Sequence, residues 1–432
     1  MSKKIQKETG RILRIMIESG WIVFGQIVAV IGSLILVKVL TERLTPTQYG
    51  ELALGLTVAG LVNQVVMGGI SSGMSRFYSV AVEKNELNIF LHDSKKLFAC
   101  SLFLVMLIGL LLVVALQIFG FSNWTGITIA VVLFSILDGL NNCLSGIQNA
   151  ARQRSIVAFN RGMDSWLKII FSLIAMTYFG ASGTSVVIGY CCSSILVNGS
   201  QLFFLRKTIP EEPISFTSQY PFFREIMVYA WPFATWGLFG WAQQSAGRWG
   251  LESFSSTADV GLYSALLQLG YAPIQLITSF TLTLLMPILF AHVGDANDKY
   301  RNADLWKRVL MLAKYGVAIV IFAFILALIL HKYVFLIFLQ ESYLSVSYCL
   351  PWMILSGGIF AIAQILASIP MALKVPKELI VASIGSSILG VIISFIGAYL
   401  FSVAGVVGAS LIHSLSYLVF VLLKLNKIKK GK

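Results

Sequence analysis

Twelve long apolar runs constrain this chain more than any other feature of its sequence. They cover residues 20–40, 50–74, 97–119, 126–149, 161–180, 184–205, 228–252, 261–289, 308–330, 347–371, 379–400 and 404–424. A helix of about 20 apolar residues spans the hydrocarbon core of a bilayer. The chain is 57% hydrophobic and 12% charged, whereas soluble domains carry about 25% charged residues. Because the ten-residue alternation of a membrane β-barrel is absent from the sequence, the runs predict an all-α integral membrane protein with twelve transmembrane helices.

The positions of lysine and arginine predict the orientation of these helices. If the N-terminus is cytoplasmic, all but four of the 32 Lys and Arg residues fall on the cytoplasmic side. The four exceptions are Lys38, Arg43, Arg248 and Lys332. The positive-inside rule then places both termini in the cytoplasm. The net charge of +13 is explained by contacts with anionic lipid head groups, and no continuous basic face suggests a nucleic-acid partner.

A polar turn between two apolar runs is repeated in the second half of the chain. RLTPTQYGELALGL (Arg43–Leu56) corresponds to SSTADVGLYSALL (Ser255–Leu267), with Gly50 and Gly261 separated by 211 residues. After the ninth run an additional segment, HKYVFLIFLQESYLS, raises the separation to 222, at which residues 146–154 match 368–376 and residues 178–186 match 400–408. Six spans per half give both halves the same orientation, so the repeats are parallel.

This repeat predicts two parallel six-helix bundles around a central cavity. The expected lobes are residues 1–205 and 226–432, joined by a cytoplasmic linker at 206–225 that contains three prolines. Transporters built from such repeats move one half against the other around a shared site. A duplicated scaffold without moving parts is the alternative.

Several short motifs resemble a known family. They are LTPTQYGELAL (Leu44–Leu54), SRFYS (Ser75–Ser79), DVGLYSA (Asp259–Ala265), LLMPILF (Leu284–Phe290) and FLQESYLSVS (Phe338–Ser347). Their order and spacing are similar to those of the polysaccharide exporters in the multidrug/oligosaccharidyl-lipid/polysaccharide (MOP) exporter superfamily.

The resemblance implies a MATE-like fold and a Wzx-type flippase in the bacterial cytoplasmic membrane. Its expected substrate is an undecaprenyl-diphosphate-linked oligosaccharide, moved from the inner to the outer leaflet. A polysaccharide polymerase and chain-length proteins are the expected protein partners. Relatives that export drugs share the six-plus-six plan, so a multidrug or cation exporter is the alternative.

Cations and amides within the runs are the candidate substrate-binding residues. Lys38, Arg76, Lys168 and Arg248 could hold a diphosphate, and the repeat-related Gln64 and Gln275 could bond sugar hydroxyls. Each has a simpler explanation. Lys38–Glu42 and Arg248–Glu252 are spaced as interfacial ion pairs, Lys168 could pair with Asp164 and snorkel, and Arg76 could be a positive-inside anchor. The two glutamines could equally bond one another.

Asp138 is the deepest ionisable residue in the runs. With Asn141, Asn142, Ser145, Gln148 and Arg152 it forms one polar helical face. We expect Asp138 and Asp164 to take up H⁺ or Na⁺ and so couple transport to an ion gradient. Hydrogen bonding between helices is the alternative explanation of this face.

The sequence carries no enzyme signature. It has no phosphate-binding glycine loop and no HExxH motif, and its five cysteines and four histidines lack metal-ligand spacing. A membrane-embedded polymerase or transferase is disfavoured because the expected outer loops are short. We therefore expect a transporter without cofactor or resident metal.

Overall fold

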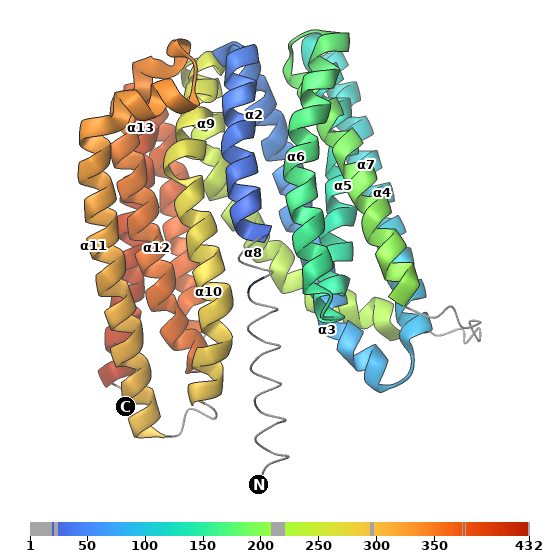
Figure 1. Ribbon diagram of the computed structural model, residues 1–432, viewed down its shortest axis with the longest axis vertical. Coiled ribbons are helices and arrows are strands. Elements are labelled where there is room, and N and C mark those ends of the chain that lie inside the picture. Colours follow the sequence, from blue (N-terminus) through green and yellow to red (C-terminus); the bar gives the residue numbers. More distant parts are fainter. Residues whose placement is uncertain are drawn as a thin grey trace. The chain divides into compact units, whose positions relative to one another are not determined.

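The computed structural model describes residues 20, 25–208, 221–293, 298–373, 375 and 377–430. Within these ranges every regular element is helical (Figure 1). The first helix is Gly25–Arg43. The elements that follow are α2 (Pro46–Leu61), η1 (Val62–Met67), α3 (Gly68–Glu83), α4 (Leu87–Ile118), η2 (Ser122–Trp124), α5 (Thr125–Ala150), α6 (Arg154–Phe179), α7 (Gly183–Thr208), α8 (Pro221–Phe254), α9 (Thr257–Gly270), α10 (Ala272–Val293), α11 (Lys299–Phe338), η3 (Glu341–Cys349), α12 (Leu350–Ala372) and α13 (Lys377–Lys430).

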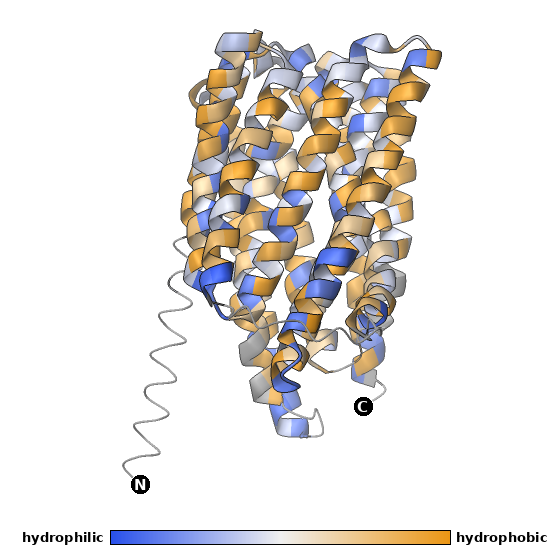
Figure 2. Ribbon diagram, turned by 90° about the vertical axis from the view of Figure 1, so that its right-hand side faces the viewer, coloured by the Kyte–Doolittle hydropathy of each residue, from blue (hydrophilic) through white to orange (hydrophobic). Residues whose placement is uncertain are grey.

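Nine segments of the described chain are long and apolar enough to cross a membrane. Residues on the outward faces of α4 and α11, such as Leu110 and Ile329, are exposed and apolar, as expected for contact with lipid. Figure 2 shows hydrophobic residues along most of the length of the helices. The prediction of an all-helical membrane protein is therefore confirmed.

The test of length and apolar character does not confirm the predicted number of twelve transmembrane helices. α6 and α8 are not among the nine segments, and α6 carries Asp164 and Lys168 within its span. α13 counts as one segment although its backbone is non-helical at Phe401 and Ser402, where Ser402 has a φ of 49°. Each of the twelve predicted ranges overlaps a described helix, although residues 21–24 of the first lie outside the described part.

The chain forms two compact units. Unit 1 contains the chain up to Leu36 together with Leu54–Trp241, and unit 2 contains Val37–Ala53 together with Ala242–Lys432. The predicted lobes 1–205 and 226–432 follow the chain order, whereas the compact units exchange a short segment at the start of each half. Most of the predicted linker 206–225 lies outside the described residues.

The start of α8 groups with unit 1 because of its packing there. Phe222 lies edge-on to Phe90, with 5.7 Å between ring centroids, and both rings are almost fully buried. The backbone N–H of Phe223 donates to the buried carboxylate of Asp93, at 3.1 Å. These contacts join α8 to α4 and close one end of the unit 1 core.

The repeated turn builds the same kind of helix start in both halves. Before α2, the Gln48 N–H donates to Thr45 Oγ1 at 3.3 Å, and the Thr45 N–H donates to Gln48 Oε1 at 3.0 Å. Before α9, Ser256 Oγ accepts from the Asp259 N–H at 3.1 Å. The bonds before α2 are reciprocal and the bond before α9 is a single cap, and both satisfy free N–H groups of a helix N-terminus. The capping positions are again 211 residues apart, as the repeat requires.

These two helix starts cross within unit 2 at a pair of glycines. A Cβ on Gly50 would overlap the carbonyl oxygen of Thr257, and a Cβ on Gly261 would overlap that of Pro46. The four positions form two pairs related by the 211-residue repeat, so the contact is reciprocal. Only glycine lets two helix backbones approach so closely.

The additional segment of the second half covers this crossing. η3 supplies Tyr343, which is fully buried and donates its hydroxyl to the carbonyl of Leu44 at 3.4 Å. The same ring lies edge-on to Tyr49, with 6.1 Å between centroids. Unit 2 therefore encloses the turn that belongs to the first half of the sequence.

Candidate functional site

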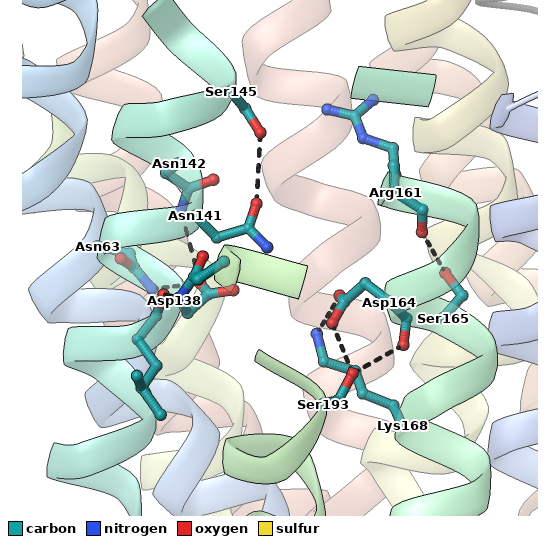
Figure 3. A network of polar contacts seen from close by, with 12 residues as sticks. Asn63, Asp138, Asn141, Asn142, Ser145, Arg161, Asp164, Ser165, Lys168 and Ser193 are labelled. Carbon is teal, nitrogen blue, oxygen red and sulfur yellow. Dashed lines mark hydrogen bonds and ion pairs between the residues drawn. The ribbon is translucent and has the colours of Figure 1, made fainter. Parts of the chain in front are cut away.

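The first polar cluster lies in unit 1 around Asp138 on α5 (Figure 3). Asp138 Oδ2 accepts from the Asn63 amide at 2.6 Å and from the Asn142 amide at 3.5 Å. Asn63 comes from η1, a π-helical turn marked by the bond from the Gly68 N–H to the Asn63 carbonyl. π-turns inserted in α-helices are frequent at functional sites.

A second group of the same unit surrounds Lys168 on α6 (Figure 3). Lys168 Nζ lies 2.6 Å from Asp164 Oδ2, and Asp164 Oδ1 accepts from Ser193 Oγ at 3.0 Å. The ammonium also lies 5.4 Å and 5.5 Å from the ring centroids of Phe134 and Tyr190. The Lys168 and Asp164 side chains are only 17% and 18% exposed, so Lys168 is held inside the unit.

Together these groups place two carboxylates and one ammonium in electrostatic range of one another. Lys168 pairs directly with Asp164, whereas Asp138 is bound by amides alone among the described residues. An ionised carboxylate in a membrane-embedded bundle needs compensation. With both carboxylates ionised, the cluster would carry one net negative charge, which a bound proton or monovalent cation would balance.

The rest of the predicted polar face of α5 binds α7. Gln201 Nε2 donates to Asn141 Oδ1 at 3.3 Å and to Ser145 Oγ at 3.0 Å. Gln148 Nε2 donates to the carbonyl of Gln201 at 3.2 Å. Hydrogen bonding between helices therefore accounts for this part of the face, while Arg152 is exposed at the turn after α5.

The remaining candidates of unit 1 lie apart from this cluster. Gln64 is partly exposed on η1, and its Oε1 would lie 3.6 Å from a Cβ on Gly240. Arg76 is exposed on α3, and no ion pair or hydrogen bond of its side chain occurs among the described residues. Arg161, one turn before the cluster, donates to Gln26 at 3.5 Å.

Arg248 is the candidate cation of unit 2. Its Nε donates to Ser264 Oγ at 3.1 Å, and the Tyr49 and Tyr263 side chains lie nearby. The predicted pair with Glu252 is not formed, because the Glu252 carboxylate accepts from the Thr257 hydroxyl at 3.1 Å. Within the described ranges no carboxylate lies within ion-pair distance of the Arg248 guanidinium.

The other two candidates of unit 2 have ordinary partners. Lys38 Nζ lies 4.0 Å from Glu42, and both side chains are about half exposed, as predicted for an interfacial pair. Gln275 Nε2 donates to the carbonyl of Gly357 at 3.3 Å and so joins α10 to α12. A role for either residue in binding substrate stays a prediction.

Metal and disulfide chemistry receive no support in the described part of the chain. No group of three or more His, Cys, Asp and Glu side chains there could hold a metal ion, and all five cysteines are free.

Sequence reasoning missed three features of these sites. The π-turn at η1 has no composition signal, and the two rings that enclose Lys168 come from other helices. Ser264, the partner of Arg248, lies in the repeated turn DVGLYSA, but nothing in that motif pairs it with α8.

Comparison with known proteins identifies the family. Residues 16–293, more than half of the 432-residue chain, match the family described as polysaccharide biosynthesis protein. No curated protein sequence matches the chain.

Three solved structures of similar fold are informative. The lipid II flippase MurJ in an inward closed conformation has a TM-score of 0.70 at 14% identity, over 95% of this chain and 87% of that one. An inward-facing multidrug resistance MATE family transporter of the MOP superfamily has 0.69 at 12% identity, over 92% and 95%. A MOP superfamily transporter from Pyrococcus furiosus, described as having a binding pocket of reverse polarity, has 0.63 at 14%, over 95% and 97%.

These identities are low, so the likeness shows the fold alone, and that fold is one of transporters and flippases rather than enzymes. The chain therefore belongs to the polysaccharide biosynthesis protein family and has the fold of the MOP superfamily.

Proposed function

We propose that this protein is a flippase for an undecaprenyl-diphosphate-linked oligosaccharide. It would move the saccharide head from the inner to the outer leaflet of a bacterial cytoplasmic membrane by alternating access of its two lobes, with both termini in the cytoplasm. The family match supports a step in polysaccharide biosynthesis, and the fold shared with a lipid II flippase supports a lipid-linked substrate. A polysaccharide polymerase and chain-length proteins are the proposed partners.

The observation that carries this proposal is that the Arg248 guanidinium has no carboxylate partner among the described residues. Of the four predicted cations, Lys168 and Lys38 are each paired with a carboxylate, whereas Arg248 donates to a serine hydroxyl. Its planar fork matches two oxygens of a phosphate. Arg76 is the second cation without a described partner, and with the proposed orientation it would meet a head group from the inner leaflet.

Arg248→Ala should lower the rate of translocation roughly 10- to 100-fold, because a hydrogen bond to a charged group contributes about 1.5–3 kcal/mol. The measurement is export of a labelled lipid-linked oligosaccharide in proteoliposomes, with the amount of inserted protein determined in parallel. Arg76→Ala should give a smaller loss, since that side chain is exposed. Arg301→Ala removes an exposed arginine that pairs with Asp298 and is the matched control. Normal export by the Arg248 variant would contradict the proposal that Arg248 binds the diphosphate.

Coupling to an ion gradient is the second part of the proposal. Asp138, supported by Asp164, would take up H⁺ or Na⁺, because the cluster of unit 1 is one positive charge short of neutrality. No bound cofactor is required for this coupling.

Asp138→Asn should remove the acceleration of transport by an imposed pH or Na⁺ gradient while leaving slow downhill movement. The amide keeps the size of the side chain and removes the charge that the ion would balance. The measurement compares initial rates in vesicles with and without each gradient. Asp304→Asn, which alters an exposed carboxylate paired with Arg308, should behave like the wild type. An Asp138 variant with unchanged pH and Na⁺ dependence would contradict this role.

Export of cationic drugs is the alternative function, and one observation favours it. The cluster of unit 1 carries two carboxylates for one ammonium, an excess that suits a cation better than a diphosphate. The two functions separate in a binding experiment on the purified protein. A diphosphate-bearing lipid should lose affinity in Arg248→Ala, whereas a cationic dye should lose affinity in Asp138→Asn.

A further inference from the structure

His413 is a buried ionisable side chain that the proposed transport site does not use. It lies in the part of α13 that follows the break at Ser402, and it is 4% exposed. Its Nδ1 lies 3.0 Å from the carbonyl oxygen of Ser386. Because a carbonyl only accepts, Nδ1 carries the proton, and a neutral ring then has its free lone pair on Nε2.

The residues around this ring correspond to the charged cluster of unit 1. If the separation of 222 residues seen at residues 146–154 and 178–186 is extended to the neighbouring turns, the counterparts of Asp138, Asp164 and Lys168 are Phe360, Ser386 and Gly390. All three border the imidazole of His413. The Phe360 ring lies 5.7 Å away between centroids at an interplanar angle of 33°, and Ser386 accepts from Nδ1.

The third counterpart, Gly390, lies directly against the His413 imidazole. A Cβ on Gly390 would lie 2.8 Å from His413 Nδ1 and 3.2 Å from Gln243 Cγ. Glycine at this position leaves room for the imidazole, whereas the equivalent residue of unit 1 is Lys168 itself. His413 corresponds to Cys191, the neighbour of the Tyr190 whose ring covers the Lys168 ammonium. The Lys168 ammonium of unit 1 and the His413 imidazole of unit 2 therefore lie at equivalent places. They come from helices that do not correspond in the repeat, because the counterpart of Lys168 is Gly390.

The electrostatic surroundings of the two bases differ. Lys168 has two carboxylates in range, and both are replaced in unit 2 by Phe360 and Ser386. α12 contributes Phe360 and contains no acidic or basic residue, and α8 contributes the neutral Gln243. Among the described residues, two titratable side chains lie against Phe360 at tilted angles, Tyr271 at the end of α9 and Tyr417 on α13.

We propose that His413 is a proton-binding site of unit 2, neutral in the described conformation and protonated in a second conformation in which the ring has left the Phe360 face. Imidazole is the side chain that ordinarily changes charge between about pH 5 and pH 8. A proton that arrives from water at Nε2 creates an imidazolium with no carboxylate beside it in the described part of unit 2. Its burial is unfavourable, so protonation shifts the population toward a conformation that exposes the ring to water.

The break in α13 is where the His413 ring could move relative to Ser386. Ser386 and His413 lie on the two parts of α13, and the non-helical backbone at Phe401 and Ser402 separates them. Loss of the bond between them would remove one contact that joins the two parts of α13, which also pack closely at Gly397 and Gly405. Lys168 differs from His413 in this respect, because its Nζ is paired with the Asp164 carboxylate at 2.6 Å.

Two measurements on the full-length protein in lipid nanodiscs test the site, and neither depends on transport or on a substrate. The first is nitrogen NMR of labelled histidine imidazoles from pH 5 to pH 8, with the His413 signal assigned by its loss in His413→Gln. The second is hydrogen exchange of α12 and α13 at matched pH values, with each variant compared to the wild type at the same pH. We expect the His413 signal to titrate. We also expect exchange in both helices, expressed relative to the intrinsic amide rate at each pH, to rise severalfold on acidification in the wild type and to stay at its neutral-pH level in His413→Gln.

Two further variants sharpen the result. Gly390→Ala should displace the ring from Ser386 and raise exchange in α13 already at pH 8, toward the level of the acidified wild type. His331→Gln is the matched control, since His331 Nδ1 also bonds a neutral oxygen, Ser347 Oγ at 3.1 Å, and this variant should keep the wild-type acid response. A His413 imidazole that stays neutral throughout, or a His413→Gln protein that retains the acid response, would overturn the proposal.

Discussion

Gly261→Ala should prevent unit 2 from reaching its native packing and cause a large loss of stability. The new Cβ would overlap the carbonyl oxygen of Pro46 and lie 2.8 Å from its carbonyl carbon. Both atoms belong to the backbone of the first turn of α2, so no side-chain rotation can relieve the overlap. Overpacking a protein core costs about 1–3 kcal/mol when side chains can adjust, and a backbone obstacle should cost more.

The measurement is the yield of monodisperse protein in detergent, together with its apparent melting temperature. Gly50→Ala should show the same loss, since its Cβ would overlap the carbonyl oxygen of Thr257. Gly408→Ala is the matched control, because nothing lies within 4 Å of its Cβ in α13. Alanine in a helix is favoured over glycine by about 0.5–1 kcal/mol, so this variant should be as stable as the wild type or more so. Equal melting of the Gly261 and Gly408 variants would contradict the need for a close crossing.

The apolar runs and the repeat could be read from the sequence because both depend on local pattern. A run of apolar residues gives a helix wherever it lies, and the repeat appears again as equivalent capping bonds before α2 and α9. The repeat relates Gly50 to Gly261 but does not predict their contact, because only residues at the symmetry axis meet their counterparts. The sequence pattern could not predict that residues 37–53 pack with the second half. This packing depends on long-range contacts such as that between Tyr343 and Leu44.

The site was predicted less completely than the fold, for a related reason. Helical spacing brought Asp164 and Lys168 together correctly, because residues four apart share one face. The same rule failed for Arg248 and Glu252, where Ser264 and Thr257 from α9 offered each side chain another partner. The aromatic rings around Lys168 come from α5 and α7, and one sequence contains no signal for such a meeting.

Lys168→Met should destabilise unit 1 by about 3–5 kcal/mol, the cost typical of removing one partner from a buried ion pair. Methionine keeps the apolar stem between Phe134 and Tyr190 and removes only the ammonium. Asp164 would then keep Ser193 as its side-chain partner, in a place where its carboxylate is 18% exposed. The measurement is the apparent melting temperature in detergent at one fixed scan rate, because the unfolding of such proteins is often irreversible.

The double variant Lys168→Met/Asp164→Asn should recover most of the lost stability. Replacing both members of a buried pair by neutral groups is often close to neutral, since it removes the cost of burying two charges along with their attraction. The asparagine can still accept from Ser193, so the contact between α6 and α7 is kept. If the single variant is as stable as the wild type, the pair does not compensate Asp164. If the double variant is no better than the single one, Lys168 contributes through Asp138 instead, the other carboxylate within its range.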